Sequence, residues 1–230
     1  MERLRDVAGL LNLAAQESNP TMFRNKTFKF IEVLHLSRDL AIALKYLHSD
    51  FHKDAMILHR DLKPENLGLD PNGKLKLFDF GLCRCVFKRG NENQLYEMTG
   101  NTGSLRYMAP EVVLGQPYTE KVDVYSFAMI MWTFAKSKSP FKGFDRAMHR
   151  ARVVINGERP KLDPDWPMEF MTLLDACWSQ QDSLRPDFVE IEIRLDEMIE
   201  LFSKDKDRDS TSLKSTTKGL NFLKTIFTKR

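Results

Sequence analysis

The chain of 230 residues has few cysteines and no long apolar run, and both shortages exclude classes of protein. Its three cysteines do not predict a disulfide framework, and Cys83 and Cys85 without a second pair do not predict a zinc site. The longest apolar-rich run, residues 122–135, contains Asp123 and is shorter than the ~18 residues that cross a bilayer. The first residues also lack an apolar signal core. We therefore expect a cytoplasmic protein, with the nucleus as the alternative, and no transmembrane segment.

The charge is spread unevenly along the chain, although the whole carries only +3. Residues 203–230 hold eight Lys/Arg and three Asp/Glu, a net charge of +5, which leaves 27 basic and 29 acidic residues, or −2, in residues 1–202. We expect one folded domain over 1–202 and a basic, disordered tail over 203–230. The end of the tail has the pattern of a weak basic amphipathic helix, for which contact with a membrane or an acidic partner competes with a solvated end. No nucleic-acid partner is expected.

Hydrophobic spacing predicts a mainly α-helical fold with small β-hairpins. Helices are expected over residues 4–16, 28–48, 121–136, 144–156, 168–178 and 187–202. Short apolar pieces predict strands at 57–58, 67–69 and 75–78, with a hairpin turn at 70–73. The stretch 79–111 is polar and has no sustained period, as expected of a mobile loop.

Three short strings occur in a fixed order in the middle of the chain. They read His-Arg-Asp-Leu-Lys-Pro-Glu-Asn over residues 59–66, Asp-Phe-Gly over 79–81 and Ala-Pro-Glu over 109–111. Each of their polar side chains taken singly has an ordinary structural explanation, because Asp and Asn commonly cap turns. Together, in this order and spacing, the strings resemble those of a eukaryotic protein kinase. The resemblance covers about residues 1–202.

The resemblance implies transfer of a phosphoryl group from ATP to a protein hydroxyl, with Mg²⁺ as the metal and a protein as the substrate. Asp61 is the candidate that orients the hydroxyl and accepts its proton, and Lys63 is the candidate that balances phosphate charge. Asn66 and Asp79 offer the hard oxygen ligands that Mg²⁺ prefers. Gly81 completes the second string.

Other positions are expected to support this site. His59 and Phe80 match the two lower members of the apolar spine that kinases run between their lobes. Glu111 and Arg185 match the buried ion pair that anchors the end of the activation segment. Asp123 matches the carboxylate that receives backbone N–H groups from the catalytic loop.

Arg60 directly precedes Asp61, as in kinases whose loop is switched by phosphorylation. A phosphate on Thr99, Thr102 or Ser104 is expected to pair with Arg60 and to order the segment. The alternative is that these hydroxyls merely serve the glycine turns around them. Ser104 lies where Ser/Thr kinases place a hydroxyl that contacts the catalytic Asp and Lys, so we assign it to the site.

Two further patterns indicate the group within the family. The string Lys-Pro-Glu-Asn over residues 63–66 is typical of Ser/Thr-specific kinases. Residues 123–127, 176–178 and 185–188 resemble the tyrosine-kinase-like group. The joint interpretation is a serine/threonine-protein kinase of the tyrosine-kinase-like group.

The chain also departs from the family, because it contains no Gly-x-Gly-x-x-Gly and no strand lysine ahead of the three strings. The expected architecture is therefore a kinase-like C-lobe alone, a helical bundle whose small β-hairpins carry the catalytic and Asp-Phe-Gly loops. Gly68 is a smaller departure, since many kinases have leucine there, under the adenine. Two explanations stay open: a truncated kinase, which we favour because the four candidate side chains are intact, and a non-catalytic kinase-like docking module. The isolated chain is expected to have little or no activity.

Overall fold

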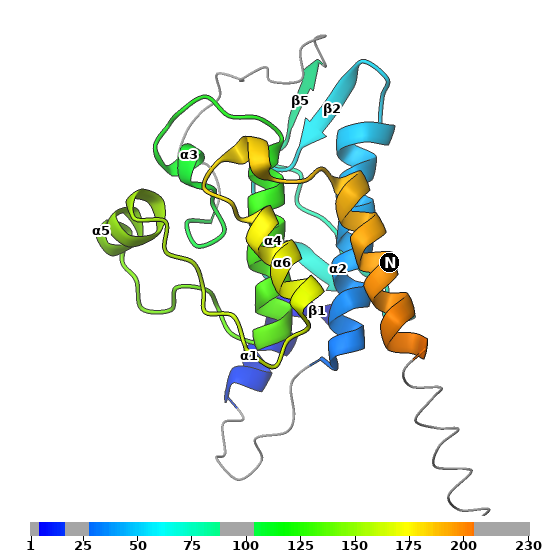
Figure 1. Cartoon of the computed structure of the whole chain (residues 1–230). Helices are drawn as coiled ribbons and strands as arrows, with labels where there is room; N and C mark the ends of the chain where they lie inside the picture. Colours follow the sequence, from blue (N-terminus) through cyan, green and yellow to red (C-terminus); the bar gives the residue numbers. More distant parts are fainter. Residues whose placement is uncertain (1–4, 17–27, 88–103, 205–230) are drawn as a thin grey trace, which may run out of the picture.

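The computed structural model describes residues 5–16, 28–87 and 104–204, which form a mainly α-helical fold (Figure 1). Its longer helices are α1 (Val7–Gln16), α2 (Phe30–Lys45), α4 (Lys121–Lys136), α6 (Met168–Cys177) and a last helix over residues 188–204. Figure 1 shows α4 in the middle of the bundle, with α6 in front of it and α2 beside the last helix. The prediction of a mainly α-helical fold is confirmed.

Helix α4 is the centre of the core because its sequence offers no polar face. Every residue from Val122 to Ala135 is buried. Ser126 satisfies its buried hydroxyl by donating to the carbonyl of Tyr107 at 2.7 Å, which avoids the cost of an unpaired polar group. The helix has the predicted bounds 121–136 and ends where Ser137 adopts a left-handed φ of 52°.

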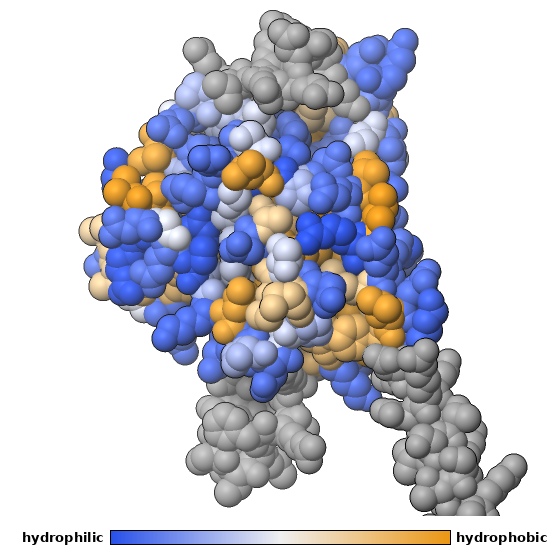
Figure 2. Space-filling model, in the orientation of Figure 1, coloured by the Kyte–Doolittle hydropathy of each residue, from blue (hydrophilic) through white to orange (hydrophobic). Residues whose placement is uncertain are grey.

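Charged and aromatic pairs fasten α2 to its neighbours. Arg38 pairs with Asp196 of the last helix, and Lys45 pairs with Glu192 of the same helix at 2.6 Å. The ring of Phe30 lies 5.0 Å, centroid to centroid, from an aromatic ring of α6. The face drawn in Figure 2 is mostly hydrophilic, with its apolar side chains in separate groups.

Two small antiparallel sheets carry the loops that concern function. One contains β1 (Arg5–Asp6), β3 (Leu67–Leu69) and β4 (Leu75–Leu77), and the other contains β2 (Ala55–Leu58) and β5 (Arg84–Phe87). The predicted β3–β4 hairpin is confirmed. Its turn is held by the carboxylate of Asp70, which accepts the backbone N–H groups of Asn72 and Lys74 at 2.9 Å each. Gly73 occupies the left-handed position of the turn, with a φ of 81°.

The start of the first helix differs from the prediction over 4–16. Arg5–Asp6 is a strand that pairs with β3, and the helix begins only at Val7. The carboxylate of Asp6 accepts the N–H groups of Ala8 and Gly9 at 3.0 Å each, which satisfies donors that the first turn of a helix leaves unpaired. Pairing and capping therefore override the apolar spacing that suggested an earlier start.

The stretch 79–111 contains regular structure, so the prediction of a loop over its whole length was wrong. It contains β5 and the beginning of the short helix α3 (Pro110–Val113). Strand β5 gave no sequence signal because only Val86 of its four residues is buried. Residues 88–103 of the predicted loop, and the tail from 205 to 230, lie outside the described residues.

The remaining helices differ from their predicted bounds by a few residues. The helix predicted over 28–48 consists of α2 and the π-helical turn η1 (Tyr46–Asp50). The helix predicted over 144–156 consists of α5 (Arg146–Met148) and the π-helix η3 (His149–Ile155). The last helix covers 188–204 rather than 187–202, and α6 ends one residue before the predicted 178. Within the described part of the chain, no helix has both the length and the apolar character needed to cross a membrane.

Candidate active site

The first string, residues 59–66, is the loop that joins β2 to β3. It closes with the 3-10 turn η2 (Pro64–Asn66), in which proline takes the first position, where its missing N–H costs nothing. The N–H of Phe78, just after β4, donates to the carbonyl of Asn66 at 3.1 Å. The next residue is Asp79, so the β3–β4 hairpin brings the second string to the end of the first.

A buried carboxylate of α4 anchors this loop from below. Asp123 accepts the backbone N–H of His59 at 2.8 Å and that of Arg60 at 2.9 Å, and its Oδ2 lies 2.9 Å from Nε2 of His48. Burial acts to raise the pKa of Asp123, but the bonds from His48, Arg60 and His59 outweigh it and lower the pKa below its usual range. The carboxylate is therefore the fixed, charged support of the loop.

Two residues of the strings have left-handed backbone although neither is glycine. Arg60 has a φ of 70° and Asp79 has a φ of 61°. Such a conformation costs about 1–3 kcal/mol and persists only where the surroundings impose it. The bond from the N–H of Arg60 to Asp123 supplies that constraint in the catalytic loop. Strained positions of this kind cluster at functional sites.

Asp61 is the point on which the polar side chains of the site converge. It is only 6% exposed. Its Oδ2 lies 2.6 Å from Nζ of Lys63 and accepts a bond of 3.3 Å from Nδ2 of Asn66, which also donates to the backbone carbonyl of Asp61 at 2.8 Å. The hydroxyl of Ser104 donates to Oδ1 at 3.3 Å. The carboxylate is thus oriented by three side chains, two of which come from its own loop.

Asp79 has a different environment, although it lies at the same end of the hairpin. It is exposed, and its Oδ1 accepts the N–H of Gly81 at 3.2 Å. Asn66 uses its amide nitrogen on Asp61, which leaves its amide oxygen as a ligand. Among residues 5–16, 28–87 and 104–204, no group of three His, Cys, Asp or Glu could hold a metal by itself. The donors fit a magnesium ion that takes one carboxylate, one amide and phosphate or water oxygens.

The rings of His59 and Phe80 meet edge to face. Their centroids lie 5.4 Å apart with an interplanar angle of 61°. His59 is fully buried, whereas Phe80 is half exposed. The two predicted spine positions are therefore in contact, and only His59 is shielded from solvent.

Glu111 and Arg185, for which an ion pair was expected, are joined by two bonds. Nη1 and Nη2 of the guanidinium lie 2.6 and 3.0 Å from Oε1 and Oε2 of the carboxylate. The guanidinium also donates to the backbone carbonyls of Ser179 and Lys121 at 3.0 Å each, and it lies 5.2 Å from the centroid of the Tyr125 ring. This satisfied pair ties α3, at the end of the activation segment, to the loop before the last helix.

Only one of the three candidate phosphorylation sites lies within the residues that the structure describes. Thr99 and Thr102 lie outside the described residues, so their pairing with Arg60 stays a prediction. Ser104 is described, and it contacts Asp61 as given above. Of the three candidates, Ser104 is therefore placed beside the carboxylate of Asp61.

Two contributors to the site were not found from the sequence. His48 reaches Asp123 from η1, and no local pattern marks a helical histidine as a partner of a carboxylate 75 residues away. Cys83 donates its thiol to the carbonyl of His59 at 3.5 Å. Burial raises the pKa of this thiol to about 12, so it stays protonated and unreactive at neutral pH.

Comparisons with known proteins identify the family of the chain. A family model described as "Protein kinase domain" matches residues 8–193. The Serine/threonine/tyrosine-protein kinase HT1 of Arabidopsis thaliana is 36% identical over 179 residues, which cover 76% of this chain and 43% of that protein. The Serine/threonine-protein kinase STY17 of the same plant is 34% identical, over 75% of this chain and 28% of that protein. The Serine/threonine-protein kinase VIK, also from this plant, is 37% identical, over 75% of this chain and 39% of that protein. The chain spans less than half the length of these curated relatives.

Proposed function

This chain belongs to the protein kinase domain family, and we propose that it forms the acceptor-binding and catalytic-loop half of a serine/threonine-protein kinase. In this proposal residues 1–202 are the C-terminal lobe, residues 203–230 are a basic tail, and the reaction moves a phosphoryl group from ATP to a protein hydroxyl. The observation that carries the proposal is Asp61, a buried carboxylate oriented by Lys63, Asn66 and Ser104.

Asp61 is the proposed general base. It accepts the proton of the acceptor hydroxyl and holds the oxygen in line for transfer, a role worth about 10²–10⁴-fold in rate. Lys63, 2.6 Å from the carboxylate, offsets negative charge that develops on the transferred group. Ser104 restricts the rotation of the carboxylate through its bond to Oδ1. Positioning and charge are what phosphoryl transfer needs from a protein.

Asn66 and Asp79 are the proposed metal ligands, because an amide oxygen and a carboxylate oxygen are hard ligands of the kind that Mg²⁺ prefers. A magnesium ion at this position would neutralise charge on the phosphate oxygens. The buried Asn66 is fixed by two bonds to Asp61, which couples the position of the metal ligand to that of the base. Asp79 is the adjustable member of the pair, because it is exposed and bonded within its own turn.

The test measures transfer of radiolabelled γ-phosphate to a serine-containing protein. Since the 230 residues contain no glycine-rich phosphate loop, we expect little or no transfer by the chain alone. We expect transfer by a chimera in which the region preceding the matched segment of the HT1 kinase is joined ahead of residue 8. In that chimera Asp61→Asn should lower the rate by about 10²–10⁴-fold.

A matched control is Asp54→Asn, the same chemical change on a carboxylate whose side chain is 62% exposed. It should leave transfer unchanged. Equal rates for the Asp61→Asn and unmodified chimeras would reject Asp61 as the base. Strong transfer by the 230-residue chain, lost with Asp61→Ala, would instead reject the expected dependence on a nucleotide-covering segment.

A further inference from the structure

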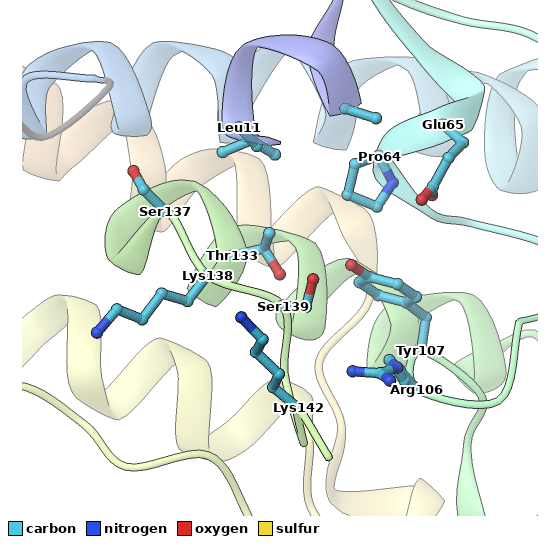
Figure 3. Close-up of a pocket in the computed structure, with 11 residues that line it drawn as sticks. Leu11, Pro64, Glu65, Arg106, Tyr107, Thr133, Ser137, Lys138, Ser139 and Lys142 are labelled. Atoms are coloured by element: carbon cyan, nitrogen blue, oxygen red, sulfur yellow. The ribbon is translucent and has the colours of Figure 1, made fainter. Parts of the chain in front are cut away.

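A cavity of about 560 Å³ adjoins the loop of residues 59–66. Pro64 and Glu65 of the loop line one side of it, and α1 covers it with Leu11 (Figure 3). Arg106 and Tyr107 line it as well, two and three residues after Ser104. Ser104 bonds to Asp61, and Pro64 lies three residues after Asp61 in the same loop. The cavity therefore borders the proposed base through the loop of residues 59–66 and through the segment that begins at Ser104.

The lining of the cavity carries more positive than negative charge. Arg106, Lys138 and Lys142 are its cations, and Glu65 is its one carboxylate. Figure 3 shows the three cations on the side formed by Arg106 and the segment after α4, with Glu65 on the side of the catalytic loop. Neither lysine forms an ion pair with a residue that the structure describes, and both are exposed. Their charge is therefore available to a ligand.

Arg106 is held in place rather than extended into solvent. Its Nη1 donates to the carbonyls of Pro140 and Phe141, at 3.4 and 3.5 Å. These bonds use one of the nitrogens of the guanidinium fork. Arg106 and the segment before Lys142 are thereby joined, so the positive side of the cavity is built from two segments that support each other.

The lining of the cavity also contains neutral hydrogen-bonding groups. Ser137, at the left-handed end of α4, has a buried hydroxyl without a described partner. Burial raises the pKa of Tyr107, so its hydroxyl remains a proton donor. Ser139 adds one more hydroxyl, whereas the hydroxyl of Thr133 already donates to the carbonyl of Met129 at 2.7 Å. Hydroxyls beside cations are the groups that bind carboxylate or phosphate oxygens.

We propose that this cavity binds an anionic side chain, glutamate, aspartate or phosphoserine, that lies close to the acceptor hydroxyl in the substrate of the kinase. The inference deepens the proposed function, because it names the class of substrate segment that the same site accepts. Charge complementarity carries it: three cations face one carboxylate in a cavity that borders Asp61. A substrate with basic residues near the acceptor is the competing outcome, and only Glu65 in the lining favours it.

The test measures peptide binding by fluorescence anisotropy with the 230-residue chain. Three labelled peptides share one acceptor serine and differ only at the flanking positions, which are glutamate, alanine or lysine; a fourth carries phosphoserine. We expect the glutamate and phosphoserine peptides to bind about tenfold more tightly than the lysine peptide at low salt, and the preference to shrink as ionic strength rises. The double variant Lys138→Glu/Lys142→Glu should remove the preference, and Lys138→Gln/Lys142→Gln should reduce it.

The charge-matched control is Lys53→Glu/Lys74→Glu, two exposed lysines that do not line the cavity. It should keep the preference of the unmodified chain. Equal binding of all peptides, tighter binding of the lysine peptide, or equal losses in the control and the cavity variant would each overturn the proposal. Binding does not require transfer, so these outcomes bear on the cavity alone. Full transfer by the Asp61→Asn chimera bears on the proposed function alone.

Discussion

Two carboxylates of the candidate site, Asp61 and Asp79, differ in how the protein holds them. Asp61 is buried in a loop fixed to Asp123 and is bonded to three side chains. Asp79 is exposed, and its carboxylate is bonded to the N–H of Gly81 in its own turn. The proposed proton acceptor is thus held in place by the fold, whereas the proposed metal ligand can adjust to what it binds. Pre-organisation is most useful at the reacting oxygen, where misplacement is costly in rate.

The largest expected effect comes from removing the anchor of the catalytic loop. Asp123→Ala leaves His48 and the N–H groups of His59 and Arg60 buried without their acceptor. We expect the free energy of unfolding to fall by about 3–5 kcal/mol. Urea denaturation measures it, with Asp54→Ala as the exposed control. A loss equal to that of the control would show that Asp123 does not hold the loop.

Acid should weaken the same anchor. The folded-state pKa of Asp123 is lowered, so its contribution is complete above the unfolded value of about 3.9 and disappears as pH falls through the folded pKa. The difference in unfolding free energy between the unmodified chain and Asp123→Asn should therefore be constant near pH 7 and shrink below about pH 4. A difference that grows on acidification would have the wrong sign for this account.

A smaller effect on stability is expected when Asp61, the proposed base, is changed. Asp61→Asn keeps the shape of the side chain but removes the charge that pairs with Lys63. The free energy of unfolding should fall by about 1.5–3 kcal/mol, the scale of a hydrogen bond to a charged group. A thermal shift assay on the 230-residue chain measures the change. No shift at all would indicate that the pair with Lys63 is not formed in solution.

The smallest effect is expected at the exposed carboxylate. Asp79→Asn should change the free energy of unfolding by no more than about 0.5 kcal/mol, as is usual for exposed positions. The same urea experiment measures it beside Asp61→Asn. A loss larger than that of Asp61→Asn would reverse the contrast between the two carboxylates.

The sequence predicted those parts of the site that stand in short strings. Asp61, Lys63, Asn66 and Asp79 lie within eight-residue and three-residue strings, and the β3–β4 hairpin brings these strings together. The bounds of α4 followed from an apolar run that can only be a core helix. These features depend on local spacing, which a single sequence displays.

Features that depend on distant segments could not be predicted. His48 meets Asp123 only because α2 and α4 pack together. Strand β5 forms because it pairs with β2, since its own sequence has no alternation of buried and exposed residues that would predict a strand. The positive cavity combines Arg106 with Lys138 and Lys142, which lie in separate segments without a shared motif. Burial and long-range pairing decided these cases.

Hydrogen–deuterium exchange of backbone amides tests most directly whether the catalytic loop is assembled in this chain before nucleotide binds. The N–H groups of His59 and Arg60 donate to a buried carboxylate, whereas that of Gly81 donates to an exposed one. We predict that the first two amides exchange at least ~10²-fold more slowly than that of Gly81. Equal and fast exchange at all three amides would contradict a preformed site around Asp61.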